Sequence, residues 1–287
     1  MRKLALILIT IFVFTGLIMF YSKSIAREPK TLVTRFSFGK KGKDLGEFKS
    51  ITGLTIKDNY LFTADSGNNR IQVLQINSDG SLSAKFTFGK EGKGLGEFSG
   101  PLGLAIKGDY LFIADSGNNR IQVLQINSDG SLFAKFTFGK EGHGLGEFGR
   151  FSDPLFGEFS HPLNLSIKND YLFVTDPGNN RIQVLKINSD GGLSSKFAFG
   201  KAGRKLGEFN MSFSLTTKDD YLFVADSGNY RIQVFRINLN GSLSPRFAFG
   251  KGLRELGAVL TAVAINENYL FVSDTRNTHI QVWEIIY

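Results

Sequence analysis

The feature of this sequence that most constrains its fold is an internal repeat of about fifty residues. The tract Tyr-Leu-Phe-x-x-Asp occurs five times along the chain. Its aspartates are Asp65, Asp115, Asp176, Asp226 and Asp274. Residues 60–98 and 110–148 are identical at 36 of 39 positions. Such self-similarity is typical of proteins in which each copy is one structural unit that packs against its neighbours.

Each unit contains four short strand signals separated by turns. In the first unit they lie at Gly53–Lys57, Tyr60–Ala64, Ile71–Ile76 and Leu82–Phe88. β-Branched and aromatic residues favour strands there, and residues 77–80 form a hairpin turn with glycine where a positive φ is needed. A four-stranded sheet that is apolar on both faces cannot bury both alone. Copies stacked around an axis can, which predicts an all-β propeller of four-stranded blades.

The number of units predicts five blades in residues 32–287. The last unit stops after its third strand, and we expect Leu32–Gly39 to supply the fourth. This N-terminal strand would close the ring and remove an open sheet edge. One repeat is longer than the others by eleven residues, and Gly149–Phe159 is expected to be a loop insertion there.

The turn after each second strand carries a family resemblance. Ala64–Val73 reads Ala-Asp-Ser-Gly-Asn-Asn-Arg-Ile-Gln-Val and resembles the core of the NHL repeat. The other copies are Ala114–Val123, Thr175–Val184, Ala225–Val234 and the degenerate Ser273–Val282. Gly-Glu-Phe at 96–98 and Pro-Leu-Gly-Leu at 101–104 are also similar to the family. The resemblance implies a β-propeller, and because NHL propellers commonly have six blades, six is the alternative to five.

Residues 1–26 are expected to lie outside the propeller. Arg2 and Lys3 precede an uncharged run over residues 4–21, and the small residues Ser24 and Ala26 follow. This pattern is typical of an export signal, but the run is also just long enough to span a bilayer. We predict a cleaved signal peptide or a membrane anchor, and the length of the run favours the anchor. Residues 27–31 would then link it to an extracytoplasmic propeller, which would be secreted if the signal is cleaved.

The aspartate and arginine of each repeat turn are predicted to be structural, because every blade needs them. A short carboxylate can accept backbone N–H groups of a tight turn, Gly67 is expected to adopt a left-handed conformation, and arginine can pair with the carboxylate. The arginines are Arg70, Arg120, Arg181 and Arg231. Alternatively, the turns form a ligand-contacting face. Calcium is disfavoured, since one carboxylate per turn supplies too few oxygen ligands.

The long loop between consecutive blades carries a repeated basic pattern. A lysine follows Phe-Gly, a second basic residue or histidine lies three positions later, and four copies then carry glutamate. The pairs are Lys40 and Lys43, Lys90 and Lys93, Lys140 and His143, Lys201 and Arg204, and Lys251 and Arg254. This loop and the repeat turn should emerge on one face, giving two cationic rings around the mouth of the axis. They would form either a solvated rim of weak Lys–Glu pairs or an electrostatic funnel for an anionic partner.

The residues favour a binding or sensing module over an enzyme. The chain has no cysteine, and His143, His161 and His279 occupy unrelated repeat positions. The sequence therefore predicts no metal centre, no cofactor site and no catalytic triad. The expected partner is an unidentified protein or anionic ligand at the loop face, and residues 4–21 would contact the membrane if uncleaved.

Two other classes of function stay open. The NHL-like propellers that this chain resembles include lyases and hydrolases with an axial active site. Such an enzyme is the first alternative. Nucleic-acid binding is the second. It suits the basic residues of the inter-blade loops, but the export segment argues against it.

Overall fold

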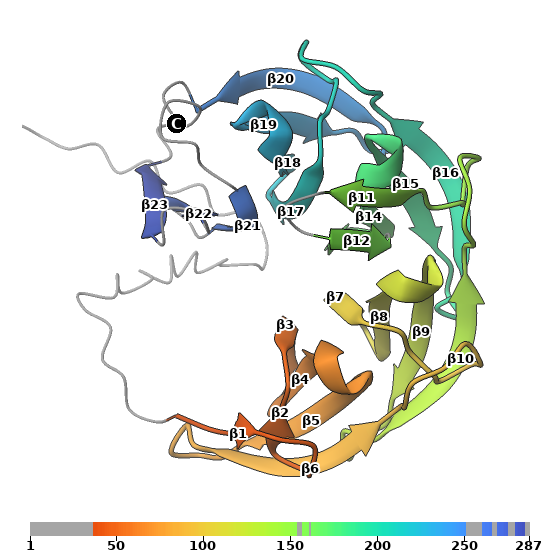
Figure 1. The fold of residues 1–287 in the computed structure, drawn as a ribbon, viewed down its shortest axis with the longest axis vertical. Helices are drawn as coiled ribbons and strands as arrows, with labels where there is room; N and C mark the ends of the chain where they lie inside the picture. The colour runs from red at the N-terminus through yellow and green to blue at the C-terminus, as the bar shows by residue number, and fades with distance from the viewer. Residues whose placement is uncertain are drawn as a thin grey trace, which may run out of the picture. The chain divides into compact units, whose positions relative to one another are not determined.

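Antiparallel sheets make up most of the chain that the structure describes. The computed structural model describes residues 37–153, 157–160, 162–250, 260–265, 269–274 and 279–284. Within residues 38–287, four sheets have four strands and a fifth has three. They form an all-β propeller of five blades, as predicted (Figure 1). No helix in the described segments is long and apolar enough to cross a membrane, and residues 1–26 lie outside those segments.

Strands follow one another in chain order from the inner to the outer side of each blade (Figure 1). Blade 1 comprises β3 (Ile51–Lys57), β4 (Tyr60–Asp65), β5 (Arg70–Ile76) and β6 (Leu82–Phe88). Blade 2 comprises β7 (Pro101–Lys107), β8 (Tyr110–Asp115), β9 (Arg120–Ile126) and β10 (Leu132–Phe138). Blade 3 comprises β13 (Leu165–Lys168), β14 (Tyr171–Asp176), β15 (Arg181–Ile187) and β16 (Leu193–Phe199). Blade 4 comprises β17 (Ser212–Lys218), β18 (Tyr221–Asp226), β19 (Arg231–Ile237) and β20 (Leu243–Phe249). Blade 5 comprises β21 (Leu260–Ile265), β22 (Tyr269–Asp274) and β23 (His279–Glu284).

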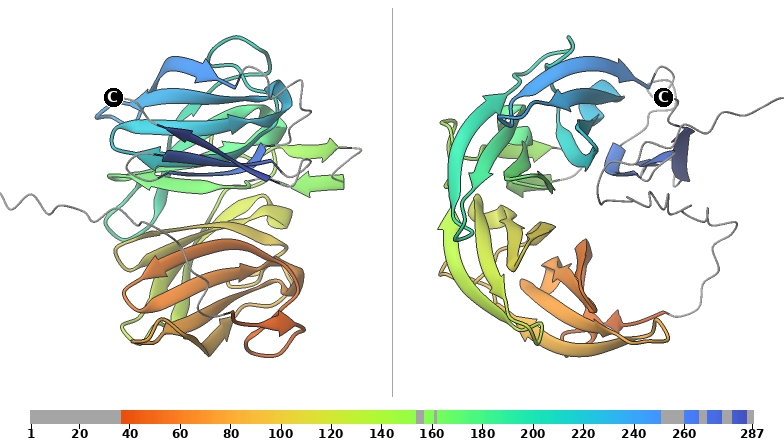
Figure 2. Two further views of the ribbon diagram at one scale, coloured as in Figure 1. Left: turned by 90° about the vertical axis from the view of Figure 1, so that its left-hand side faces the viewer. Right: turned by 180° about the vertical axis from the view of Figure 1, so that it is seen from behind.

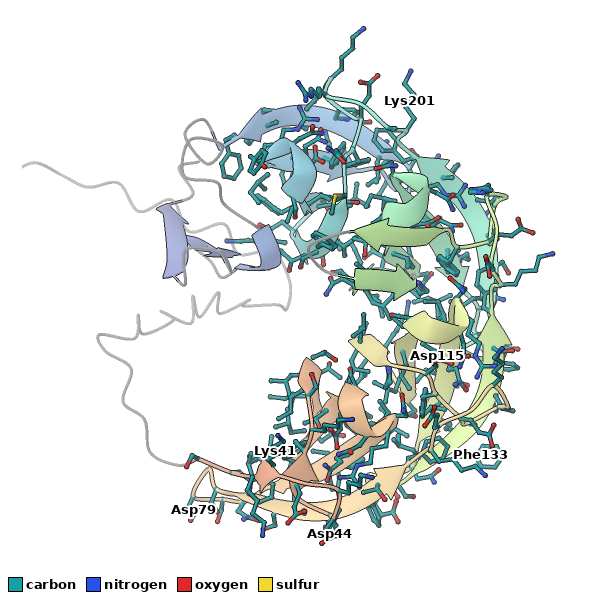
Figure 3. All side chains as sticks on the ribbon, in the orientation of Figure 1. Lys41, Asp44, Asp79, Asp115, Phe133 and Lys201 are labelled. Atoms are coloured by element: carbon teal, nitrogen blue, oxygen red, sulfur yellow. The ribbon has the colours of Figure 1, made fainter. Side chains whose placement is uncertain are left out.

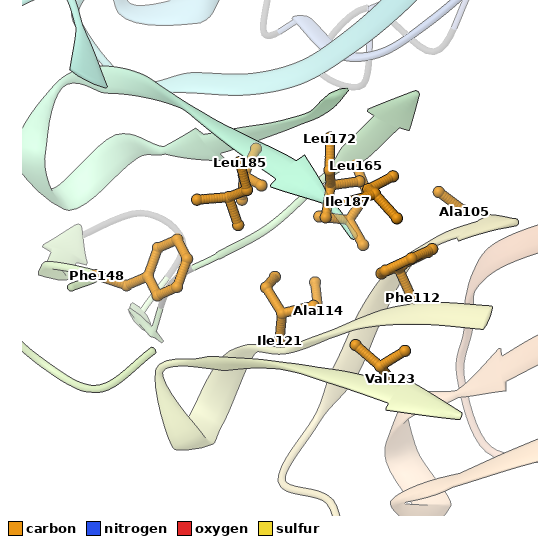
Figure 4. Packing of buried hydrophobic residues seen from close by; sticks show 11 residues of the cluster. Ala105, Phe112, Ala114, Ile121, Val123, Phe148, Leu165, Leu172, Leu185 and Ile187 are labelled. Carbon is orange, nitrogen blue, oxygen red and sulfur yellow. The ribbon is translucent and has the colours of Figure 1, made fainter. Parts of the chain in front are cut away.

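The apolar core lies between adjacent blades. Phe112, Ile121 and Val123 of blade 2 pack with Leu172 and Ile187 of blade 3, and all five side chains are buried (Figure 4). Similar clusters lie between blades 1 and 2 and between blades 3 and 4. Successive strand residues point to opposite faces, so one set contacts the preceding blade and the other set the following blade. This arrangement explains why a single unit cannot bury its own faces.

Two glycines allow the inner strands of neighbouring blades to come close together. A Cβ atom on Gly53 would lie 2.1 Å from the carbonyl oxygen of Leu102 in blade 2. Gly103 donates its backbone N–H to the carbonyl oxygen of Leu163 at 3.0 Å, and a Cβ there would lie 2.7 Å from that oxygen. Any larger residue at either position would push two blades apart.

One face of blade 1 is largely exposed. Leu54 is 60% exposed, whereas its repeat equivalent Leu104 is 8% exposed against blade 1. Ile56 is exposed in the same way. The predicted closing strand, Leu32–Gly39, lies outside the described residues except for positions 37–39, which are not in a strand. Closure of the ring by this segment therefore stays a prediction.

The insertion between blades 2 and 3 is a hairpin, so the expectation of a plain loop was wrong. Its strands are β11 (Arg150–Asp153) and β12 (Gly157–Ser160), which pair antiparallel with Phe151 opposite Phe159. The hairpin contacts the 3-10 turns η2 (Ser116–Asn118) and η3 (Pro177–Asn179), and it projects from that end of the blades (Figure 2). Eleven residues are enough to form this two-stranded sheet, because its two strands of four residues satisfy the hydrogen bonds of each other's backbone.

Salt bridges connect consecutive blades at the end of the sheets opposite these turns. In each one, the lysine that ends the first strand of a blade contacts an aspartate in the next blade. The pairs are Lys57–Asp109 at 3.2 Å, Lys107–Asp170, and Lys168–Asp220 at 3.4 Å. Because these groups are partly exposed, each bridge contributes little alone.

Asp170 makes this set of bridges sensitive to acid. Hydrogen bonds from Lys107 and then Lys186 lower the pKa of Asp170 to about 2. A carboxylate with a lowered folded pKa stabilises the fold above its unfolded pKa of about 3.9 and loses that contribution as pH falls toward 2. We expect the thermal unfolding midpoint, followed by circular dichroism, to fall more steeply between pH 4 and pH 2 in the wild type than in Asp170→Asn. Equal acid slopes in the two proteins would contradict this assignment.

Candidate functional site

Two loops of each blade meet at one end of the sheets. The first is the repeat turn between the second and third strands, which contains η1 (Ser66–Asn68) in blade 1. The second is the inter-blade loop that precedes the blade, residues 39–50 in the same case. Arg70 of the turn donates hydrogen bonds to loop carbonyls at Lys43, Asp44 and Glu47. The two loops therefore emerge on the same face, as predicted, and we call it the loop face.

A buried aspartate holds each inter-blade loop against its turn. Asp65 Oδ1 accepts the backbone N–H of Lys49 at 2.9 Å, and Asp65 Oδ2 accepts Arg70 Nε at 2.9 Å and Asn68 Nδ2 at 2.8 Å. The predicted Asp–Arg pairing recurs at 2.7 Å in Asp115–Arg120, Asp176–Arg181 and Asp226–Arg231. Asp274 ends β22, and the residues that follow it, 275–278, lie outside the described chain.

Burial and hydrogen bonding act on these carboxylates in opposite directions. For Asp65, burial raises the pKa, but hydrogen bonds from Asn68, Lys49 and Arg70 outweigh it and hold the pKa below its ordinary value. For Asp226, burial is the larger effect and raises the pKa despite the same kind of partners. The balance between burial and hydrogen bonding therefore differs between the first and the fourth turn.

Two details of the predicted turn are wrong. Asp65 accepts N–H groups of the preceding loop, where its own turn had been expected to supply them. The left-handed residue is Asn69, with φ of 53°, a conformation that asparagine tolerates well. Gly67 is required for space instead, because a Cβ there would lie 2.7 Å from Lys49 Cγ. Asn69 Oδ1 also accepts the backbone N–H of Gly100 at 2.8 Å and so reaches the next loop.

A glutamine that sequence reasoning missed completes the network. Gln72 is fully buried, and its Oε1 accepts the backbone N–H of Gly46 at 2.9 Å. Its Nε2 donates to the carbonyl oxygen of Glu47 and to Asp65 Oδ2. The equivalents are Gln122, Gln183 and Gln233. The available signal was a glutamine at the third position of the third strand in every copy.

The first lysine of each described loop is paired with the glutamate of the same loop. The Nζ–Oε1 distances are 3.0 Å for Lys40–Glu47, 3.2 Å for Lys90–Glu97, 3.0 Å for Lys140–Glu147 and 3.5 Å for Lys201–Glu208. Glu97 also accepts the backbone N–H of Gly94 at 2.9 Å, and this bond together with Lys90 holds the pKa of Glu97 below its usual range. These lysines stay highly exposed, so their pairs add little stability but cancel charge.

The second basic position carries side chains without an ion pair. Lys43, Lys93 and Arg204 have no ion pair with any residue that the structure describes, and His143 Nδ1 contacts Asn179 Oδ1. Lys251 and Arg254 lie outside the described residues. Of the two expected sets of cations, only this second set is uncompensated in the described blades.

The cationic excess is also uneven around the loop face. The loop at 39–50 holds four basic and two acidic residues, and the loop at 200–210 holds three and one. The loop at 89–100 is balanced with two of each, and the loop at 139–149 has one lysine against two glutamates. Positive charge therefore gathers at blades 1 and 4, and Lys201 lies at the outer side of the sheets, away from the inner strands (Figure 3).

A hollow of about 130 Å³ opens beside the fourth turn. It is lined by Arg204, Gly228, Asn229, Tyr230 and Arg231. Tyr230 has φ of 54° at the position that is asparagine in the first three blades. A left-handed tyrosine is uncommon and costs of order 1 kcal/mol. The fourth turn thus replaces a structural amide by an aromatic ring next to an unpaired guanidinium.

The inner strands offer little acid–base chemistry. None of β3, β7, β13, β17 and β21 contains histidine, aspartate or glutamate. Across the described ranges, no three His, Cys, Asp or Glu side chains gather closely enough to hold a metal ion. The loop face is therefore where the described charged groups concentrate.

Comparison with known proteins adds a family model and a set of folds. The model of the NHL repeat matches residues 98–124, and no curated protein matches the chain. A protein of Lactobacillus plantarum is 18% identical with a TM-score of 0.62 over 84% of this chain and 72% of its own. A functionally unknown protein of Desulfotomaculum acetoxidans is 19% identical with a TM-score of 0.58, over 82% and 69%. A candidate 6-phosphogluconolactonase of Bacteroides uniformis is 14% identical with a TM-score of 0.61, over 82% and 67%. At these identities the likeness concerns the fold alone.

Proposed function

Since this chain is an NHL-repeat β-propeller, we propose that it is a binding module whose loop face takes an anionic group of a partner. The observation that carries the proposal is Arg204, which has no ion pair in the described part of the chain and borders the hollow at Tyr230. A guanidinium presents paired donors that fit carboxylate and phosphate oxygens. The hollow is large enough for one such group.

Three features of blade 4 support this location over the other blades. Its loop has the joint largest basic excess of the described loops, and its Lys201–Glu208 pair is the longest of the four at 3.5 Å. The strained Tyr230 lacks the side-chain amide with which Asn69 and Asn180 bind the following loop. Backbone strain that persists against a less strained alternative often marks a binding site.

The place of action we propose is outside the cytoplasm, with the propeller tethered to a membrane or secreted. The support is the sequence of residues 1–26, with its basic start, apolar run and small residues. An enzymatic role has no supporting observation. The candidate 6-phosphogluconolactonase shares only the fold with this chain, and the described inner strands contain no histidine, aspartate or glutamate.

The proposal is tested with a fluorescent hexaglutamate peptide, titrated by anisotropy against the full-length protein. The double variant Arg204→Gln/Tyr230→Asn should bind about tenfold more weakly, since a hydrogen bond to a charged group contributes about 1.5–3 kcal/mol. Its fold should persist, because asparagine restores the residue of the other turns. Binding by the wild type should also weaken as salt shortens the Debye length below about 8 Å.

Arg236→Gln is the matched control. Arg236 is exposed on β19 of the same blade, lines a separate hollow with Asn238 and Ser242, and changes charge equally when replaced. It should bind hexaglutamate like the wild type. If the Arg204 and Arg236 variants lose affinity equally, only net charge matters and the site beside Tyr230 is refuted.

A further inference from the structure

Each described inter-blade loop exposes a leucine at the same position. Leu45, Leu95, Leu145 and Leu206 are 48%, 53%, 50% and 43% exposed. The fourth loop reads Lys-Ala-Gly-Arg-Lys where the second reads Lys-Glu-Gly-Lys-Gly, yet both continue with leucine. The leucine is retained and solvent-exposed although the rest of the loop sequence differs between copies. Packing does not explain this.

A tight turn places each leucine at an outer corner. In blade 2, Glu97 donates its backbone N–H to the carbonyl oxygen of Gly94 at 3.1 Å, and Gly96 has φ of +80°. A type II turn requires a positive φ at that third position, so Leu95 takes the preceding corner. The equivalent glycines are Gly46, Gly146 and Gly207, with φ of +82°, +81° and +84°.

The buried network described above fixes the backbone on both sides of this corner. Arg120 Nη2 donates to the carbonyl oxygen of Gly94 at 2.8 Å, and Gln122 Oε1 accepts the N–H of Gly96 at 2.9 Å. The leucine between them cannot turn inward without breaking these bonds. Two residues earlier stands the second basic position, Lys93, whose carbonyl oxygen accepts Arg120 Nη1 at 2.6 Å. The network therefore presents a rigid pair, one cation or histidine and one leucine, in the loops that precede blades 1 to 4.

We propose that these leucine turns, residues 43–46, 93–96, 143–146 and 204–207, dock on an anionic lipid bilayer. The cations meet the headgroups, and the leucines enter the boundary between headgroups and acyl chains. This inference rests on the proposed anion-binding loop face and names its partner. Combined apolar and cationic contact is how proteins lie on anionic membranes. The predicted membrane contact of residues 4–21 would bring such a surface within reach.

The absence of cysteine from the chain allows a single-site test in the full-length protein. Asp44→Cys carries an environment-sensitive fluorophore beside Leu45, and Ser78→Cys carries it in the exposed turn at the other end of blade 1. The protein is mixed with phosphatidylglycerol or phosphatidylcholine vesicles that contain a quencher in the acyl region. We expect quenching at position 44 on phosphatidylglycerol only, reversed by 1 M salt, and no quenching at position 78.

Two variant sets identify the groups responsible. Replacing all four leucines by serine in the Asp44→Cys protein should cut quenching by at least about tenfold. Each leucine that enters the bilayer contributes strongly to the affinity for the vesicle. Replacing Lys43, Lys93 and Arg204 by glutamine should raise the lipid concentration needed about a hundredfold, at roughly fivefold per cation. Thermal unfolding of both sets should match the wild type, because these side chains are exposed.

The results separate this inference from the proposed function. Lipid docking is refuted if position 44 stays unquenched on phosphatidylglycerol or is quenched equally on phosphatidylcholine. It is also refuted if the serine variant keeps its quenching, or if that variant changes only the oligomeric state in sedimentation. Hexaglutamate binding that depends on Arg204 and survives in the serine variant would in those cases still support the anion site.

Discussion

Replacing Asp115 by alanine should lower the free energy of unfolding by about 3–5 kcal/mol, because it leaves a nearly buried charge without its partner. The Asp115 carboxylate is fully buried and accepts hydrogen bonds from Arg120, Asn118, Gln122 and the backbone N–H of Ser99. The Arg120 side chain is only 12% exposed. Urea denaturation followed by circular dichroism measures the loss.

Two further variants separate the charge from the shape of this side chain. Asp115→Asn keeps an acceptor and the size, so it should cost less than alanine. Asp129→Ala removes an exposed carboxylate in the turn at the other end of the same blade and should stay within about 1 kcal/mol of the wild type. A loss of that small size for Asp115→Ala would show that the network does not hold the loop.

Phe98→Ala should cost a similar amount, about 3–5 kcal/mol, by opening a cavity between loop and sheet. Phe98 is fully buried, and its ring meets Phe88 edge to face with 6.4 Å between centroids. The chain at Gly89 lies so close that a Cβ there would be 2.4 Å from the Phe98 ring. Surrounding atoms therefore have little freedom to collapse into the cavity.

An exposed phenylalanine in the same blade provides the control. Phe133 on β10 is 62% exposed, and its replacement by alanine should change the free energy of unfolding by no more than about 0.5 kcal/mol. The measurement is the same urea titration. Equal losses for the two variants would mean that Phe98 is not part of a packed core.

The blades and the Asp–Arg pairs were predictable because repetition amplifies local signals. Five copies of one strand and turn pattern leave few architectures open, and a carboxylate and a guanidinium that flank a turn, as Asp65 and Arg70 do, have little choice of partner. Strand limits in blade 1 also agreed within two residues, with β3 beginning at Ile51 where Gly53 was expected.

The remaining features depend on contacts between segments that are distant in sequence. Lys40 and Lys43 look alike as letters, and only the position of Glu47 shows that one is paired and the other is not. The exposed Leu45 is likewise indistinguishable in sequence from a core leucine. The choice of Asn69 over Gly67 as the left-handed residue follows from the crowding of Gly67 against Lys49, which the local pattern does not contain.

The one-way order of the salt bridges has a consequence for assembly. Each inter-blade bridge among the described residues runs from a lysine of one blade to an aspartate of the next, as in Lys57–Asp109. The contact is therefore heterologous, because two different sides of the blade meet. The exposed face at Leu54 is the side of a blade that packs against the preceding blade. Only the opposite side of another blade can cover it. We expect the last blade of the same chain to supply that side, at an effective concentration of order millimolar. We expect exchange with another copy only when sedimentation is run near that concentration, so that below it each chain completes itself.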